Sequence, residues 1–248
     1  MSIEPCCLKG FMWDGTPTGR VDELAGLPTY VAGSSSQAAI LLITDLFGWT
    51  FPNLRLLADH FAQEVGATVY VPDFFDGEVI STDALLNDRW HEIDLEGFTQ
   101  RNSREARETA IFAFARAMRT RHAKVGAIGY CYGGWVVFRL GAKEHEPSLV
   151  DCISAGHPSL LIKKDIDEAA VPVQILAPEF DQAYTAELKL HTFVTLQKRG
   201  VPFDYQHFHG VEHSCLVRGN DRKPGEREAM VRGKNAAVAW LRQFLVEP

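Results

Sequence analysis

The chain has 248 residues, of which 46% are hydrophobic and 23% charged. This composition is typical of a globular protein that buries a sizeable core. The 25 basic residues against 32 acidic ones give a net charge of −7, which argues against a nucleic-acid partner, since such a partner would need a basic surface.

The sequence shows no long apolar span and no signal-like start at Met1. We therefore expect no membrane association and a cytoplasmic location. The length allows one α/β domain over residues 1–248. The chain has five cysteines, an odd number, and none of them form the C-x₂-C units typical of metal sites. We therefore expect reduced thiols rather than a disulfide framework.

Apolar strands and amphipathic helices alternate along the chain. Residues 38–43 are continuously apolar, as expected for a parallel strand covered on both faces. Apolar residues recur at helical spacing before Gly66, which predicts a helix that ends there. The stretch from Phe75 to Asn102 shows little periodicity, and we interpret it as an excursion of the chain over the functional site. The order predicts a mostly parallel, doubly wound sheet with helices on both faces. The helical patterns cover residues 54–65, 110–118 and 230–244, and further strands are expected at 125–128, 171–177 and 203–209.

A strand, a sharp turn and a helix are predicted around Cys131. The motif Gly-Tyr-Cys-Tyr-Gly-Gly at residues 129–134 follows an apolar run and precedes a helical pattern. This is the arrangement of a nucleophile elbow, written with cysteine instead of serine. Glycine is needed at Gly129 and Gly133 because a side chain there would collide as the backbone doubles back. The elbow predicts an exposed thiol at a helix start, where the dipole favours thiolate. The alternative is a buried structural cysteine beside a glycine-rich turn.

Candidates for an acid and a base follow in the chain order that this elbow requires. Asp181 stands in a polar turn after an apolar strand, and His213 stands just past another strand. The carboxyl ends of parallel strands gather at one edge of a sheet, so Cys131, Asp181 and His213 can converge. Glu179 competes with Asp181 for the role of acid, and Asp204 is a weaker competitor.

Three other histidines compete for roles near His213. His207 and His209 lie two apart in a strand and point to one face of it. With His213 they form an array that can bind zinc, but the chain has no HExxH motif and no finger-type Cys/His spacing, so we predict no metal. His157 follows another apolar strand, where it either packs or binds substrate.

These motifs resemble the dienelactone hydrolase family, cysteine-dependent members of the α/β-hydrolase fold. The resemblance rests on the elbow at 129–134, on Phe208-His209-Gly210-Val211-Glu212-His213, and on two segments nearer the N-terminus, residues 42–48 and 70–75. The segment Cys6-Cys7-Leu8-Lys9-Gly10-Phe11 is similar to the eukaryotic, especially fungal, branch.

The resemblance implies further site residues. The backbone N–H groups of Leu46 and Tyr132 would form the oxyanion hole. An acidic residue, usually glutamate in the family, contacts the resting thiol; Asp45 holds this position here with a side chain one methylene shorter, and it can also serve as a plain helix-start carboxylate.

Arginines of the family can grip a substrate carboxylate. Arg218, soon after His213, and Arg89, on the excursion, are the candidates, and Trp49 is a candidate for lining an apolar pocket.

The sequence therefore predicts a hydrolase of small carboxylic esters or lactones that uses a Cys-His-Asp triad, an acyl-thiol intermediate and no cofactor. We expect a small-molecule substrate and a monomer or homodimer. Two alternatives stay open: a redox-sensing thiol protein, for which Cys152 could serve as the resolving cysteine, and a non-catalytic binding module of the same fold.

Overall fold

An eight-stranded sheet forms the centre of the computed structural model, which describes residues 11–86, 89–220 and 222–247. The strand order is β1-β2-β4-β3-β5-β6-β7-β8. β2 pairs antiparallel with β1 and with β4, and all other neighbours are parallel. The strands are β1 (Arg20–Leu24), β2 (Leu27–Ala32), β3 (Ala38–Ile43), β4 (Thr68–Pro72), β5 (Lys124–Tyr130), β6 (Cys152–Gly156), β7 (Val173–Phe180) and β8 (Phe203–Glu212).

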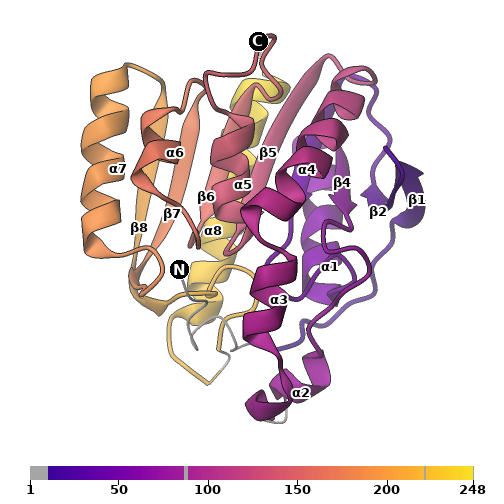
Figure 1. Ribbon diagram of the computed structural model, residues 1–248, viewed down its shortest axis with the longest axis vertical. Coiled ribbons are helices and arrows are strands. Elements are labelled where there is room, and N and C mark those ends of the chain that lie inside the picture. The colour runs from indigo at the N-terminus through magenta and orange to yellow at the C-terminus, as the bar shows by residue number, and fades with distance from the viewer. Residues whose placement is uncertain (1–10, 87–88, 221, 248) are drawn as a thin grey trace.

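Helices cover both faces of this sheet. Figure 1 shows α4, α5, α6 and α7 in front of the sheet and α8 behind it. The π-helical turn η2, which continues α1, packs against α8. The helices are α1 (Pro52–Phe61), η2 (Ala62–Gly66), α2 (Thr82–Leu86), the 3-10 helix η3 (Trp90–Glu92), α3 (Leu95–Arg101), α4 (Arg104–Arg119), α5 (Gly133–Leu140), α6 (Lys163–Asp167), α7 (Ala186–Arg199) and α8 (Glu226–Leu245).

The predicted doubly wound α/β architecture is confirmed. Every residue of β3 is buried, as its continuous apolar run predicts for a parallel strand between two helix layers. The first predicted helix ends at Gly66, whose φ of 80° suits glycine. Element boundaries differ by a few residues from those predicted: the strand expected at residues 203–209, for example, continues through residues 210–212 in β8, past an irregularity in its pairing with β7.

The excursion between β4 and α4 carries three short helices, α2, η3 and α3. Its last part contacts the turn after β5. The Tyr132 hydroxyl donates to the carbonyl oxygen of Asn102 at 2.8 Å, and the Tyr132 ring packs edge-on to Phe75 with centroids 4.9 Å apart. The excursion is thus fixed to the residue that follows Cys131.

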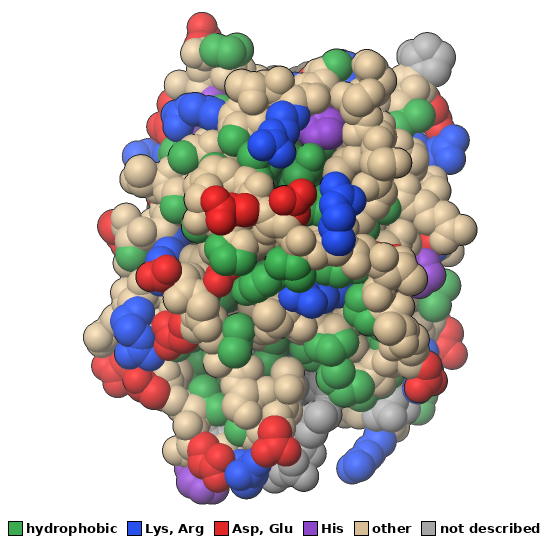
Figure 2. Space-filling view, turned by 90° about the vertical axis from the view of Figure 1, so that its right-hand side faces the viewer, with side chains coloured by type: hydrophobic (Ala, Val, Ile, Leu, Met, Phe, Trp, Pro, Cys, Tyr) green, Lys and Arg blue, Asp and Glu red, His purple; other side chains and the backbone are tan. Residues whose placement is uncertain are grey.

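The surface shows charges of both signs. On the face in Figure 2, basic and acidic side chains are interspersed, without a large area of one sign. Within the described ranges, no helix combines the length and the apolar character needed to cross a bilayer.

Candidate active site

Cys131 lies at the apex of the turn between β5 and α5 and has a φ of 50°, in the left-handed region that costs a non-glycine residue about 1–3 kcal/mol. The flanking glycines make this turn possible. A Cβ on Gly129 would lie 2.1 Å from the carbonyl oxygen of Gly133, and one on Gly133 would lie 2.7 Å from the carbonyl oxygen of Ile43 in β3. A side chain at either glycine would thus collide with the start of α5 or with β3, as the sequence analysis predicts.

The thiol itself is not exposed, contrary to the expectation from the sequence. Cys131 has an exposed fraction of 0%. Its Sγ lies 3.4 Å from the Oγ of Ser159, and the imidazole of His213 is a further hydrogen-bond partner. The elbow lifts the thiol out of the sheet, but neighbouring segments cover it.

His213 joins the thiol to a carboxylate. Its Nδ1 lies 2.9 Å from Oδ1 of Asp181, and both side chains are fully buried. The same oxygen of Asp181 accepts the backbone N–H groups of Ala183 and Tyr184, each at 2.9 Å. These bonds fix the carboxylate, which in turn orients the imidazole with its other nitrogen toward the thiol.

Charged neighbours dominate the protonation of His213. Burial opposes the imidazolium, but the negative charges of Cys131 and Asp181 and their hydrogen bonds outweigh it and raise the pKa of His213 to about 10. The cation is therefore the favoured form of His213 at neutral pH whenever the thiol is ionised.

The competing acids and histidines lie elsewhere. Glu179 bonds to the Gly210 N–H at 2.7 Å and to His209. Asp204 accepts from the amide groups of Gln174 and Gln206. His207 and His209 are exposed on β8, so the three-histidine array is divided, with His213 alone turned to Cys131.

Ser159 is a residue of this site that the sequence analysis missed. Its hydroxyl lies 3.4 Å from the Sγ of Cys131 and 3.4 Å from Nε2 of His213, so the three groups form a triangle. The sequence feature that could have indicated this contact is Gly134, where a Cβ would come within 2.2 Å of Pro158. A second glycine after the elbow thus indicates that another segment passes close to α5.

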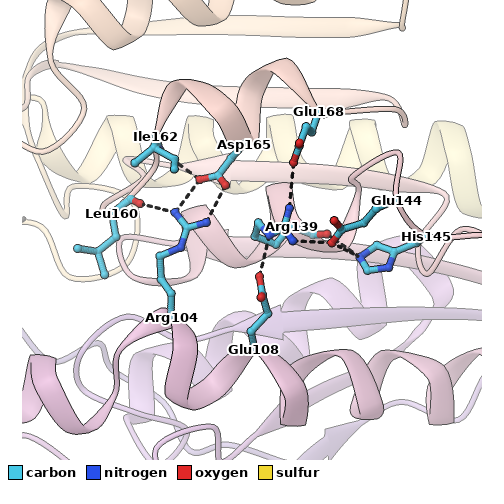
Figure 3. A network of polar contacts seen from close by, with 9 residues as sticks. All are labelled: Arg104, Glu108, Arg139, Glu144, His145, Leu160, Ile162, Asp165 and Glu168. Carbon is cyan, nitrogen blue, oxygen red and sulfur yellow. Dashed lines mark hydrogen bonds and ion pairs between the residues drawn. The ribbon is translucent and has the colours of Figure 1, made fainter.

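A network of ion pairs holds the segment of Ser159 against the elbow helix (Figure 3). Arg104 of α4 donates to the Leu160 carbonyl at 3.1 Å and binds both oxygens of Asp165 at 2.7 and 2.8 Å. The Arg104 guanidinium also lies over the Trp135 ring of α5, 4.9 Å from its centroid. Arg139, at the other end of α5, is held by Glu108, Glu144 and Glu168. The network joins α4, α5 and α6 behind the site.

His157 lies beside the catalytic candidates. Its ring centroid is 4.9 Å from that of His213, and neither ring nitrogen has a hydrogen-bond partner among the described residues. Burial, with further contributions from His213 and Arg218, lowers the pKa of His157 well below its usual value. His157 is therefore a neutral, buried group in contact with the candidate base.

Asp45 and Arg218 form a buried ion pair. Nε of Arg218 donates to Oδ2 of Asp45 at 2.6 Å, and Oδ1 accepts the Phe47 N–H at 2.9 Å. Burial raises the pKa of Asp45, Arg218 opposes the rise, and a negative charge on Cys131 adds to it. The pKa of Asp45 therefore depends on the charge of the Cys131 thiol, although the Asp45 carboxylate is bound to Arg218.

The remaining candidates take different places. Leu46 and Tyr132 are buried next to Asp45 and Cys131 in the chain, where the predicted oxyanion donors belong. The Arg55 guanidinium lies over the Trp49 ring, 4.9 Å from the ring centroid. Arg89 forms ion pairs with Asp83 and Glu92 on the excursion. A substrate-binding role for Arg89 or Trp49 stays a prediction.

Cys152 is remote from the elbow apex. It begins β6 and pairs with Gly126 in β5, whereas Cys131 follows the other end of β5. Burial raises the pKa of Cys152 and that of Cys215. Both thiols are buried, and Cys152 is not placed as a resolving partner for Cys131. Cys6 and Cys7 lie outside the described residues.

The strand order, the elbow and the surrounding helices define the α/β-hydrolase fold. A model of the dienelactone hydrolase family matches residues 27–245, and the chain belongs to this family.

Similar proteins support this placement. Hydrolase pyvD of Aspergillus violaceofuscus is 28% identical over 97% of this chain and 96% of its own length. Hydrolase tropI of Talaromyces stipitatus is 28% identical over 98% of this chain and 97% of its own length. The crystal structure of a dienelactone hydrolase described as putative, from Klebsiella pneumoniae, superimposes with a TM-score of 0.66 at 17% identity, covering 88% of this chain and 93% of that one. The predicted family and its fungal relationship are confirmed.

Proposed function

We propose that the chain hydrolyses a small carboxylic ester or lactone with Cys131 as nucleophile, His213 as base and Asp181 as its orienting acid. The observation that carries the proposal is the buried chain of contacts from the Cys131 thiol through His213 to Asp181, with an Nδ1 to Oδ1 distance of 2.9 Å. Nucleophile, base and orienter in this order are the requirements for nucleophilic catalysis.

Acylation uses the charges already present in the site. Sγ of Cys131 attacks the carbonyl carbon while His213 holds the proton of the thiol. The carbonyl π electrons move to oxygen, and the N–H groups of Leu46 and Tyr132 stabilise this oxyanion. The tetrahedral intermediate then collapses, the C–O bond breaks, and the alkoxide takes the proton from His213. A lactone ring opens in the same step, and its alkoxide end stays attached to the acyl group.

Deacylation reverses these roles. His213 takes a proton from water as the water oxygen attacks the thioester carbonyl. The second tetrahedral intermediate expels the Cys131 sulfur, and the carboxylic acid product leaves. Asp181 keeps the imidazole in one tautomer through both steps. Ser159, in contact with both sulfur and imidazole, serves as a positioning residue that holds the two groups in register.

The site contacts favour this function over the two alternatives. A pure binding module has no need for a buried His213–Asp181 pair aligned with a thiol. A disulfide-forming sensor needs a second thiol near the first, whereas Cys152 begins β6 at the opposite end of the strand pair from Cys131.

The experiment is a screen of p-nitrophenyl esters and small lactones with the wild type and a Cys131→Ala variant. We expect turnover by the wild type, a burst of the first product from the acyl-enzyme, and no turnover by the variant. Turnover by Cys131→Ala at the wild-type rate would refute the thiol mechanism.

A further inference from the structure

His207 and His209, which have no role in the candidate active site, lie together on the edge strand of the sheet. β8 is the terminal strand, and His207 and His209 alternate with the buried Phe208. Phe208 contacts Arg232 of α8, whose guanidinium is 4.4 Å from the ring centroid. Because successive side chains of a strand point to opposite faces, both histidines lie on the face away from α8.

Glu179 of the neighbouring strand completes a cluster with them. One ligand atom from each of Glu179, His207 and His209 lies within 4.8 Å of the other two. Nδ1 of His209 is 2.7 Å from Oε2 of Glu179, and the Gly210 N–H donates to the same carboxylate oxygen at 2.7 Å. The Gly210 hydrogen bond lowers the pKa of Glu179 and fixes one carboxylate oxygen beside His209.

The pairing irregularity between β7 and β8 positions this cluster. Pro178 pairs with Phe208, whereas Phe180 pairs with Glu212, so β8 carries extra residues opposite Glu179. Gly210, with φ 75°, makes the bend. The bend turns the Gly210 N–H onto the Glu179 carboxylate and fixes its side chain on the face of the two histidines.

The ligand set and the local charge select the kind of ion. Two imidazoles and one carboxylate suit Zn²⁺, Ni²⁺ and Cu²⁺, whereas Ca²⁺ and Mg²⁺ prefer oxygen ligands. Lys189 of α7 donates to the carbonyl oxygens of Pro178 and Glu179, and its positive charge disfavours ions that bind by charge alone. Ligand atoms of a tetrahedral zinc site lie roughly 3.3 Å apart, so the two exposed imidazoles need only small rotations.

We propose that Glu179, His207 and His209 form a surface binding site for a zinc-type divalent cation, with open positions for water. The site is separate from Cys131 and from the proposed hydrolytic mechanism. It joins β7 to β8 at the ends that carry Asp181 and His213, two residues after Glu179 and four after His209. A bound ion would therefore stabilise the strand pair that holds the acid and the base.

The test is a titration with zinc chloride in a non-chelating buffer, followed by calorimetry. The background is Cys6→Ser, Cys7→Ser and Cys131→Ala, which removes the thiols able to bind zinc near the N-terminus and at the elbow. In this background the variants His207→Gln and His209→Gln each remove one ligand. His60→Gln is the matched control, since His60 forms a surface pair with Glu64 at 3.1 Å without a second histidine.

We expect one zinc ion per chain, with affinity at least ~10-fold weaker in each ligand variant and unchanged in His60→Gln. Zinc at 100 times its Kd for the parent should raise Tm by about 5–10 °C, and each ligand variant should show at most about half of this rise at the same concentration. Equal affinity in all variants, loss in only one of the two ligand variants, or no binding would overturn the proposal. Circular dichroism of the metal-free variants checks that these exposed substitutions leave the fold intact.

Discussion

Replacing Ser159 by alanine tests whether its hydroxyl positions the thiol and the imidazole. The change removes two contacts of 3.4 Å, one to Cys131 and one to His213. The contact to His213 is longer than usual for a hydroxyl donor and the sulfur contact is weak by nature, so each contributes toward the lower end of about 0.5–1.5 kcal/mol. Together they amount to about 1 kcal/mol, which corresponds to a roughly 5-fold loss in kcat/KM.

Steady-state hydrolysis of the best ester from the screen measures this loss. The backbone of Ser159 donates to the Cys131 carbonyl at 2.7 Å, and this bond survives the substitution, so Tm should change little. Ser154→Ala is the matched control. Ser154 is also buried and lies in β6, just before the turn that holds Ser159, but its hydroxyl donates to Gln174 at 2.7 Å. We expect Ser154→Ala to lower stability and leave kcat/KM unchanged.

A positioning role also predicts an effect beyond rate. Ser159→Ala should shift the pH dependence of Cys131 alkylation, because the hydroxyl contacts both partners of the proton transfer. The reasoning is refuted if kcat/KM and the alkylation profile of Ser159→Ala match those of the wild type.

Five further predictions concern the same site. His213→Ala and Asp181→Asn should each lower kcat/KM by at least ~100-fold with the fold retained; near wild-type turnover would reassign the base or the acid. Because Asp181 raises the pKa of His213 toward about 10, Asp181→Asn should lower that pKa, and any activity that needs the imidazolium should be lost at lower pH than in the wild type; an unchanged basic limb would argue against the contact. Iodoacetamide labelling with peptide mapping should show that activity disappears with modification of Cys131, and loss of activity on labelling another cysteine would be inconsistent with the elbow. Asp45→Asn should speed alkylation and shift its profile to lower pH, since a carboxylate beside a thiol opposes thiolate formation; superimposable profiles would exclude a guarding role. Dialysis against a strong chelator should leave kcat/KM unchanged, because the proposed hydrolysis requires no metal, and activity lost on dialysis and restored by zinc would point to metal-activated water.

Local patterns predicted the elements well where one physical cause dominates. β3 has the predicted bounds, residues 38–43, because a fully buried parallel strand must be apolar at every position. The elbow was predictable because two steric constraints require glycine at Gly129 and Gly133. Asp181 and His213 were found because parallel strands bring their carboxyl ends together, so strand order alone fixes which polar turns can meet.

Long-range contacts without a sequence period were not predictable. Ser159 follows β6 in a turn where His157 and Leu160 both have positive φ, a conformation for which neither residue type gives a signal. The exposed thiol was also predicted wrongly, because the elbow motif describes the chain around Cys131 and not the segments that cover it. Arg218 and Asp45 were each selected as candidates, but their pairing across 173 positions depends on the tertiary fold.

The buried charges suggest how the proposed mechanism and the Asp45–Arg218 pair fit together. When the Cys131 proton passes to His213, the thiolate is paired with the imidazolium, and the net charge of the buried site does not change. The Asp45 carboxylate repels the thiolate and so opposes this transfer. In the proposed mechanism, attack of Sγ on a carbonyl moves this charge from the sulfur to the carbonyl oxygen, where the N–H groups of Leu46 and Tyr132 would stabilise it. The repulsion from Asp45 would therefore oppose formation of the thiolate and be relieved as the thiolate is acylated.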